Sequence, residues 1–184
     1  MKEFYIHINH SKFRLCFILC LICIVQNGWT QIDVFDVFRK GSVNELKLLF
    51  EENPEIINSP NEVGYTPLVL ACYSGNKEVV AFLVDKVDNI DGLSNYGTPL
   101  MAAVFKGYSE IVRILIENGV DVNMTDAKGT TAAHYAVMFR NYNLIEQLVN
   151  ANADFELKNN LQKSALDYAE MYNDNKINEI LTNK

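Results

Sequence analysis

A sequence unit of about 33 residues recurs along this chain. One copy, at residues 98–103, reads Thr-Pro-Leu-Met-Ala-Ala, and it is followed by Gly107 and by the apolar pair Ile111-Val112. The clear copies begin at Thr66, Thr98, Thr131 and Ser164, and a degenerate first copy runs from Ile32 to Leu49. A unit this short cannot bury enough apolar surface to offset the entropy of ordering its own chain. The sequence therefore predicts a stack of units that is stable only as a whole.

Each copy contains start and stop signals for two helices. Threonine or serine opens the first helix, because its hydroxyl can accept hydrogen bonds from the free N–H groups of the first turn. Proline follows at Pro67 and Pro99, in the first helical position, where no N–H is needed. Glycine at Gly41, Gly75 and Gly107 is expected to end this helix in the left-handed conformation. A second helix is predicted from the apolar pairs Leu46/Leu49, Val80/Leu83, Val112/Leu115, Ile145/Leu148 and Ile177/Leu181.

Two copies depart from this pattern in ways that predict local irregularity. The fourth copy has Arg140 where glycine is expected and Ala132 where proline is expected, so it should be less stable than the other copies. Val87 takes the position of Gly119 in the second copy, and a β-branched residue does not readily adopt the left-handed conformation. We therefore expect an irregular path from Asp85 to Leu93.

The Thr-Pro-Leu-x-x-Ala core and its period resemble those of ankyrin repeats. The resemblance covers residues 31–184 and implies an all-α fold, a solenoid of about five helix-turn-helix repeats joined by β-hairpin-like loops. The first and last copies carry more polar residues and are expected to cap the stack. The implied repeats cover about residues 31–60, 61–93, 94–126, 127–159 and 160–184.

Residues 1–30 are predicted to be a signal peptide that precedes the repeat domain. Lys12 and Arg14 come before an apolar run from Leu15 to Val25, which ends in a polar stretch. As a helix this run would span about 16 Å, roughly half of the hydrocarbon core of a bilayer. A secretory signal peptide cleaved after Thr30 is therefore favoured, with an uncleaved, tilted anchor as the alternative. The mature chain would then have no membrane span and would be periplasmic or secreted, as in the exported bacterial ankyrin proteins that it resembles.

The charge balance bears on the class of partner. The chain has 16 basic and 23 acidic residues, which gives a formal net charge of −7 at pH 7. Such a surface repels phosphate backbones and anionic lipid headgroups. We therefore expect no nucleic-acid partner, and we expect the protein to be a monomer.

The residues after the leader offer few groups for catalysis. His134 is the single histidine there, and the resemblance implies that it bridges neighbouring turns by hydrogen bonds. Cys72 is the single cysteine there, and we interpret it as a small core residue, with a redox thiol as the alternative. Asp121-x-Asn123 imitates the start of a calcium loop, but Asp126 stands where that loop needs glycine. The sequence therefore predicts no enzyme activity, no catalytic residues, no metal site and no cofactor.

The candidate site follows from the register of the copies. In the proteins that this sequence resembles, the end of the first helix and the hairpin tips line a concave face that contacts partners. This register places an aromatic residue there in four consecutive copies. The hairpin tips would add Glu62, Val63, Tyr65, Ser94, Asn95, Tyr96, Ala127, Lys128 and Thr130. Exposed aromatic and methionine side chains are typical of interface cores, whereas the alternative is that the rings are buried between helices. The predicted partner-binding residues are Tyr65, Tyr73, Phe105, Lys106, Met138, Phe139, Met171 and Tyr172, with Tyr73, Phe105 and Phe139 as expected hot spots.

Three functional hypotheses follow. The first is a non-catalytic protein–protein interaction module, an exported array that binds a protein of unknown identity on its concave face. The second is a secreted effector that acts on host proteins by binding, and a supporting factor in envelope stress defence is a related alternative. The third is a redox protein that uses Cys72. The sequence favours the first, because a rigid stack of helices loses little conformational entropy when it binds.

Overall fold

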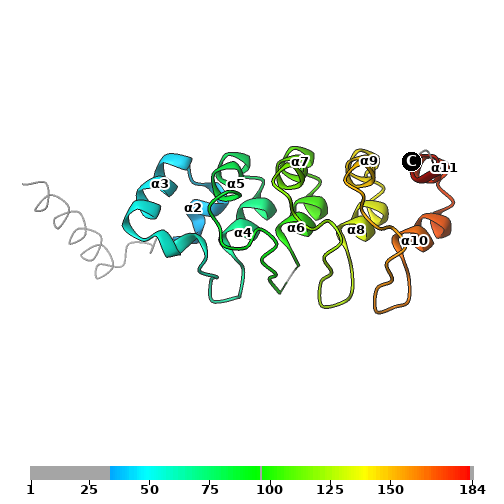
Figure 1. The fold of residues 1–184 in the computed structure, drawn as a ribbon, viewed down its shortest axis with the longest axis horizontal. Coiled ribbons are helices and arrows are strands. Elements are labelled where there is room, and N and C mark those ends of the chain that lie inside the picture. The colour runs from blue at the N-terminus through cyan, green and yellow to red at the C-terminus, as the bar shows by residue number, and fades with distance from the viewer. Residues whose placement is uncertain (1–33, 96, 183–184) are drawn as a thin grey trace, which may run out of the picture. The chain divides into compact units, whose positions relative to one another are not determined.

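The computed structural model describes residues 34–95 and 97–182, and the regular elements of this part of the chain are all helices (Figure 1). The predicted signal peptide and its cleavage site lie outside the described residues. The described residues belong to one compact unit. Two isolated antiparallel bridges, between Ser94 and Gly97 and between Lys158 and Ser164, lie in the loops that join successive helix pairs. The fold is therefore the predicted all-helical repeat array with hairpin-like loops.

Five helix pairs follow one another along the described chain, and we name the first helix of each pair the A helix and the second the B helix. The B helices lie in one row and the A helices in the next, with the long loops projecting beyond the A helices (Figure 1). The A helices are α2 (Phe35–Lys40), α4 (Pro67–Ser74), α6 (Pro99–Lys106), α8 (Ala132–Met138) and α10 (Ala165–Tyr172). The B helices are α3 (Val43–Glu52), α5 (Lys77–Leu83), α7 (Ser109–Glu117), α9 (Tyr142–Asn150) and α11 (Asn175–Thr182), and a short 3-10 helix, η1 (Pro54–Ile57), follows α3.

The predicted capping signals act as expected at the start of four A helices. The hydroxyl of Thr66 accepts the N–H of Val69, and equivalent bonds begin α6, α8 and α10. Pro67 and Pro99 occupy the first position of α4 and α6. At the other end, Gly75 and Gly107 are left-handed, each with a φ of 78°. These caps place the last turns of the A helices at equivalent positions in successive repeats.

Gly41 is an exception, and the prediction of a left-handed residue there is wrong. Its φ is −76° and its ψ is 168°, which is extended backbone. The glycine is needed for another reason, because a Cβ at this position would lie 2.7 Å from the Cα of Val37. Close approach of two backbone segments therefore explains this residue.

The irregular path predicted between Asp85 and Leu93 is observed. After α5 the chain continues in turns, with the N–H of Val87 bonded to the carbonyl oxygen of Leu83. Val87 is half-buried against the core, and its φ is not positive. Arg140 and Asn152, which also replace glycine, do adopt the left-handed region, with φ of 52° and 60°.

The core runs through the whole stack. In α4 and α6 the first six residues of each helix are buried, whereas the B helices bury only one face. Each middle A helix packs against the A helices before and after it, as α6 does against α4 and α8. One side of each A helix is consequently left for other contacts, and this side includes its last turn.

Polar side chains also link each repeat to the next. Asn58 accepts the N–H of Asp88, Asp91 accepts that of Asp121, and Asn123 accepts that of Asp154. At the loop tips, Asn95 and Asn160 donate to the carbonyl oxygens of Val63 and Ala127 in the preceding loops. The long loops are therefore held to one another.

Candidate functional site

The last turns of α4, α6 and α8 bring three predicted hot spots together. The rings of Tyr73 and Phe105 are stacked with centroids 6.4 Å apart, and Phe105 meets Phe139 edge to face at 5.3 Å. These geometries are the ones that aromatic pairs prefer. The caps explain the placement, because α4 and α6 end at glycines 32 residues apart and so present the same turn.

A fourth ring, Tyr135, completes this cluster, which we call the aromatic patch: Tyr73, Phe105, Tyr135 and Phe139. Tyr135 lies edge to face with Phe105 at 5.9 Å and stacks with Phe139 at 6.5 Å. Its hydroxyl donates to Asp126 Oδ2 at 3.0 Å. Burial raises the pKa of Tyr135 to about 12, and the nearby Asp126 carboxylate contributes to this rise. Tyr135 thus stays neutral and fixes the patch to the preceding loop.

The aromatic patch is substantially open to solvent. Tyr73, Phe105 and Phe139 are 48%, 47% and 52% exposed, and Tyr135 is half-buried. The rings lie against one another on the surface, and the alternative that they are buried between helices does not hold for these three residues. An exposed cluster of contiguous rings is unusual for a surface without a partner.

The other predicted site residues lie around the patch or apart from it. Lys106 places its Nζ 4.9 Å from the centroid of the Tyr73 ring. Met138 and Met171 are exposed, by 40% and 65%. Tyr65 and Tyr172 are half-buried and pack against the core, so they offer less surface than predicted. Tyr96, at a predicted loop tip, lies outside the described residues.

Sequence reasoning missed Tyr135 and Arg140 as site residues. Tyr135 stands four positions before Phe139, a spacing that places two side chains on one face of a helix. That signal was available in the sequence. The guanidinium of Arg140 lies 4.9 Å from the centroid of the Tyr172 ring. Arg140 directly follows Phe139 of the patch in the chain, and Lys106 and Arg140 each lie over an aromatic ring.

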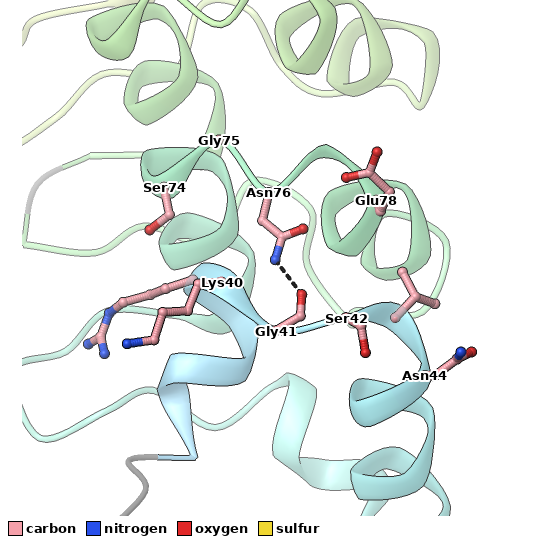
Figure 2. A pocket seen from close by; sticks show the side chains of 10 residues that line it. Lys40, Gly41, Ser42, Asn44, Ser74, Gly75, Asn76 and Glu78 are labelled. Carbon is pink, nitrogen blue, oxygen red and sulfur yellow. Dashed lines mark hydrogen bonds between the residues drawn. The ribbon is translucent and has the colours of Figure 1, made fainter.

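Apart from the aromatic patch, a hollow of about 610 Å³ lies where the turn of the first helix pair meets that of the second (Figure 2). Figure 2 shows the Asn76 side chain pointing to Gly41, whose carbonyl oxygen it contacts at 2.9 Å, while Lys40 points away. The lining combines Lys40 with the carboxylate of Glu78, and the hollow is open to solvent. Asn76 joins the two repeats beside this hollow, and no aromatic side chain is among its described lining residues, so we place the candidate site at the aromatic patch.

The groups that might have carried chemistry have structural roles. Cys72 is fully buried, and burial raises the pKa of its thiol far above the usual range. His134 is also fully buried. Its Nδ1 lies 2.8 Å from the Thr131 hydroxyl, and its Nε2 lies 3.0 Å from the carbonyl oxygen of Lys163 in the next repeat. This is the predicted bridge between neighbouring turns.

Residues 34–95 and 97–182 also lack the features of a metal site and of a membrane-spanning helix. In these segments no group of three or more His, Cys, Asp or Glu side chains is placed to hold a metal ion. Within the same residues, no helix combines the length and apolar character needed to cross a bilayer.

Comparison with known proteins agrees with the helix pairs and their period. The sequence pattern described as ankyrin repeats (3 copies) matches residues 35–126 and 118–184. The chain belongs to the ankyrin-repeat family. This assignment covers all five helix pairs, whereas the family by itself names no partner.

A curated relative with a named activity is the mitochondrial disaggregase of Bos taurus. It is 26% identical to this chain over 140 residues, which are 74% of this chain and 20% of the disaggregase. The chain thus spans about a fifth of the length of that relative. The family assignment rests on the match to ankyrin repeats, and the activity of the larger protein is not assigned to this chain.

Proposed function

We propose that this chain is a non-catalytic interaction module that binds a protein partner through the aromatic patch. Ankyrin-repeat proteins typically serve as interaction modules, which supports the general class. The observation that carries the specific proposal is the contiguous, half-exposed cluster of Tyr73, Phe105 and Phe139. Rigid aromatic side chains contribute large contact areas at low entropic cost, and they dominate binding energies at interfaces.

The experiment is a pull-down from envelope and soluble fractions of the producing cell, with two variants of the full chain beside the wild type. The patch variant is Tyr73→Ala/Phe105→Ala/Phe139→Ala. The matched control is Leu48→Ala/Leu93→Ala/Leu161→Ala, because these leucines are 65%, 52% and 75% exposed and lie outside the patch. All three proteins must first show the same helical circular dichroism.

We expect a partner that the wild type and the control retain and the patch variant loses, with affinity reduced at least about tenfold. Equal retention by the patch variant would show that the rings serve packing alone and would remove the proposed site.

The export of this protein is part of the proposal. The apolar run from Leu15 to Val25, preceded by Lys12 and Arg14, supports a cleaved signal peptide and a periplasmic or secreted protein. Mass spectrometry of the protein from its own cells checks this, with a mature N-terminus at Gln31 expected. An N-terminus at Met1 would favour an uncleaved anchor, and recovery only from the medium would favour the effector hypothesis.

A further inference from the structure

The charges around the aromatic patch are distributed in a way that indicates the chemistry of its partner. The three A helices that carry the patch, α4, α6 and α8, contain no aspartate or glutamate. The B helices carry glutamates at Glu45, Glu51, Glu52, Glu78, Glu110, Glu117, Glu146 and Glu179. Further acidic residues lie in the loops, among them Asp126, which accepts the Tyr135 hydroxyl. The patch is therefore an aromatic surface with the cations Lys106 and Arg140 beside it, and the nearby Asp126 carboxylate is already bonded to Tyr135.

Two cations mark this surface, and neither is strongly neutralised. Among the described residues, no carboxylate lies within 4.0 Å of the Lys106 ammonium. Arg140 is 3.9 Å from Asp174 Oδ2, which already accepts the Tyr142 hydroxyl at 3.0 Å. The Arg140 side chain is 52% exposed. Both cations can therefore pair with carboxylates of an incoming ligand.

From this arrangement we infer that the patch binds an acidic peptide segment that also carries aromatic or methionine side chains. This inference rests on the proposed function and names the partner's chemistry. Apolar side chains of the segment would contact Phe105 and Phe139, while its carboxylates pair with Lys106 and Arg140. Complementary charge of this kind selects partners and excludes those of the wrong sign.

The spacing of the two cations gives the segment a register. Lys106 is the last residue of α6, and Arg140 lies two positions after the end of the neighbouring α8. Packed helices lie about 8–10 Å apart. An extended peptide rises about 3.3 Å per residue, so one repeat corresponds to roughly three residues. For a segment that runs along the stack, two acidic residues about three positions apart, with an apolar residue between them, fit best.

A single-stranded nucleic acid also combines negative charge with stacking groups. The surface favours the peptide, because the formal net charge of −7 repels a long polyanion, whereas two carboxylates of a short segment match Lys106 and Arg140. A fluorescein-labelled oligothymidylate is therefore included below as a competing probe.

The test selects phage-displayed random peptides of about twelve residues that bind the full chain. An extended peptide of this length is longer than three repeats of the stack. Enriched peptides are synthesised with fluorescein, and their binding is measured by fluorescence polarisation. The test variant is Lys106→Glu/Arg140→Glu. The matched control is Lys47→Glu/Lys77→Glu, which changes the net charge equally at exposed positions on α3 and α5. Lys106→Gln/Arg140→Gln serves if the reversal disturbs folding.

We expect enriched peptides that combine Asp or Glu with Phe, Tyr, Trp or Met. Their binding should weaken about tenfold in the test variant and less than about twofold in the control. Peptides without an acidic excess, or tighter binding of the oligothymidylate, would overturn the inference.

The outcome also separates this inference from the proposed function. Peptides that lose binding in Phe105→Ala/Phe139→Ala but show no acidic excess would leave the binding site in place and remove only the charge preference. If no enriched peptide depends on these two rings, both proposals fail.

Discussion

Both carboxylate oxygens of Asp91 lie 3.1 Å from the backbone nitrogen of Asp121, so one side chain links the second and third repeats. The neutral amide of Asn58 makes the equivalent link between the first and second repeats, and that of Asn123 links the third and fourth. Burial raises the pKa of Asp91, and the nearby Asp121 carboxylate raises it further, against the lowering effect of the Asp121 N–H. Asp91 is thus the one acidic residue among these three links between repeats, and its environment disfavours the ionised carboxylate.

This link predicts that Asp91→Asn stabilises the protein near neutral pH. Because the folded pKa lies above the ordinary value of 3.8, the folded state holds this proton more tightly than the unfolded state. The stability that the folded protein gains from binding this proton is complete below pH 3.8 and is lost as the pH rises through the folded pKa. The variant should therefore be more stable than the wild type at neutral pH, by less than about 1 kcal/mol because water screens this partly exposed carboxylate, and the gain should shrink in acid.

Thermal unfolding of the variant and the wild type, measured from below pH 3.8 to neutral pH, gives the difference in stability. The matched control is Asn123→Asp, which places a carboxylate in the equivalent link and should lose stability near neutral pH. A gain for Asp91→Asn that is the same at every pH would show that ionisation of this carboxylate is not its cause.

A second prediction concerns the bridge that His134 makes between the fourth and fifth repeats. The second and third repeats have Val69 and Met101 at this position, each buried and apolar. His134→Met keeps the side chain large and apolar but leaves the Thr131 N–H and the Lys163 carbonyl oxygen without this partner. The free energy of unfolding should fall by about 1–3 kcal/mol, because the Thr131 N–H is buried, while the Lys163 carbonyl oxygen still accepts the N–H of Asn159.

Urea unfolding measures that loss, and Met101→Leu is the control, with an expected cost below about 1.5 kcal/mol. Hydrogen exchange should also show that α10 and α11 lose protection before the earlier repeats do. If His134→Met is as stable as the wild type, the bridge contributes nothing to the joining of these repeats.

The fold could be predicted from sequence where its causes are local. Helix starts depend on one hydroxyl and one proline, as at Thr66 and Pro67, and these were assigned correctly. Gly41 could not be understood in this way, because its neighbour Val37 limits the space and the φ is negative. The link from Asp91 to Asp121 joins residues 30 positions apart, so local patterns do not reveal it, and the bridge made by His134 was expected only from the family resemblance.

The candidate site was predictable only in part, for a related reason. Register alone placed Tyr73, Phe105 and Phe139 on successive A helices, and the structure brings their rings together. Register does not give the depth of a side chain, so Tyr65 and Tyr172 were expected at the surface and are half-buried. Whether these residues bind a partner stays a prediction that the variants above decide.

A third prediction tests the redox hypothesis for Cys72. Its full burial and raised thiol pKa mean that the native protein presents no thiolate to a reagent. In a full chain with Cys16, Cys20 and Cys23 changed to Ser, Ellman's reagent should react with Cys72 only at the rate of unfolding. Stoichiometric reaction in concentrated guanidinium is the control. Rapid reaction in the native state would restore a redox role.

The last prediction compares two glycines that share a conformation but not a neighbour. Gly75 and Gly107 both have a φ of 78°, so alanine is strained at either position by about 1–2 kcal/mol. A Cβ at Gly75 would also lie 2.7 Å from Cζ of Tyr108, whereas at Gly107 it would lie 3.6 Å from Nδ2 of Asn141. Gly75→Ala should therefore cost at least about 1 kcal/mol more than Gly107→Ala in urea unfolding.

The cause of that difference can be isolated with a third substitution. Tyr108→Ala removes the ring that the new Cβ would strike, so Gly75→Ala should cost less in this background than in the wild type. The change in cost is the coupling free energy between positions 75 and 108, obtained from a double-mutant cycle. Equal costs in both backgrounds would mean that the ring moves aside freely and that backbone conformation alone requires glycine at this turn.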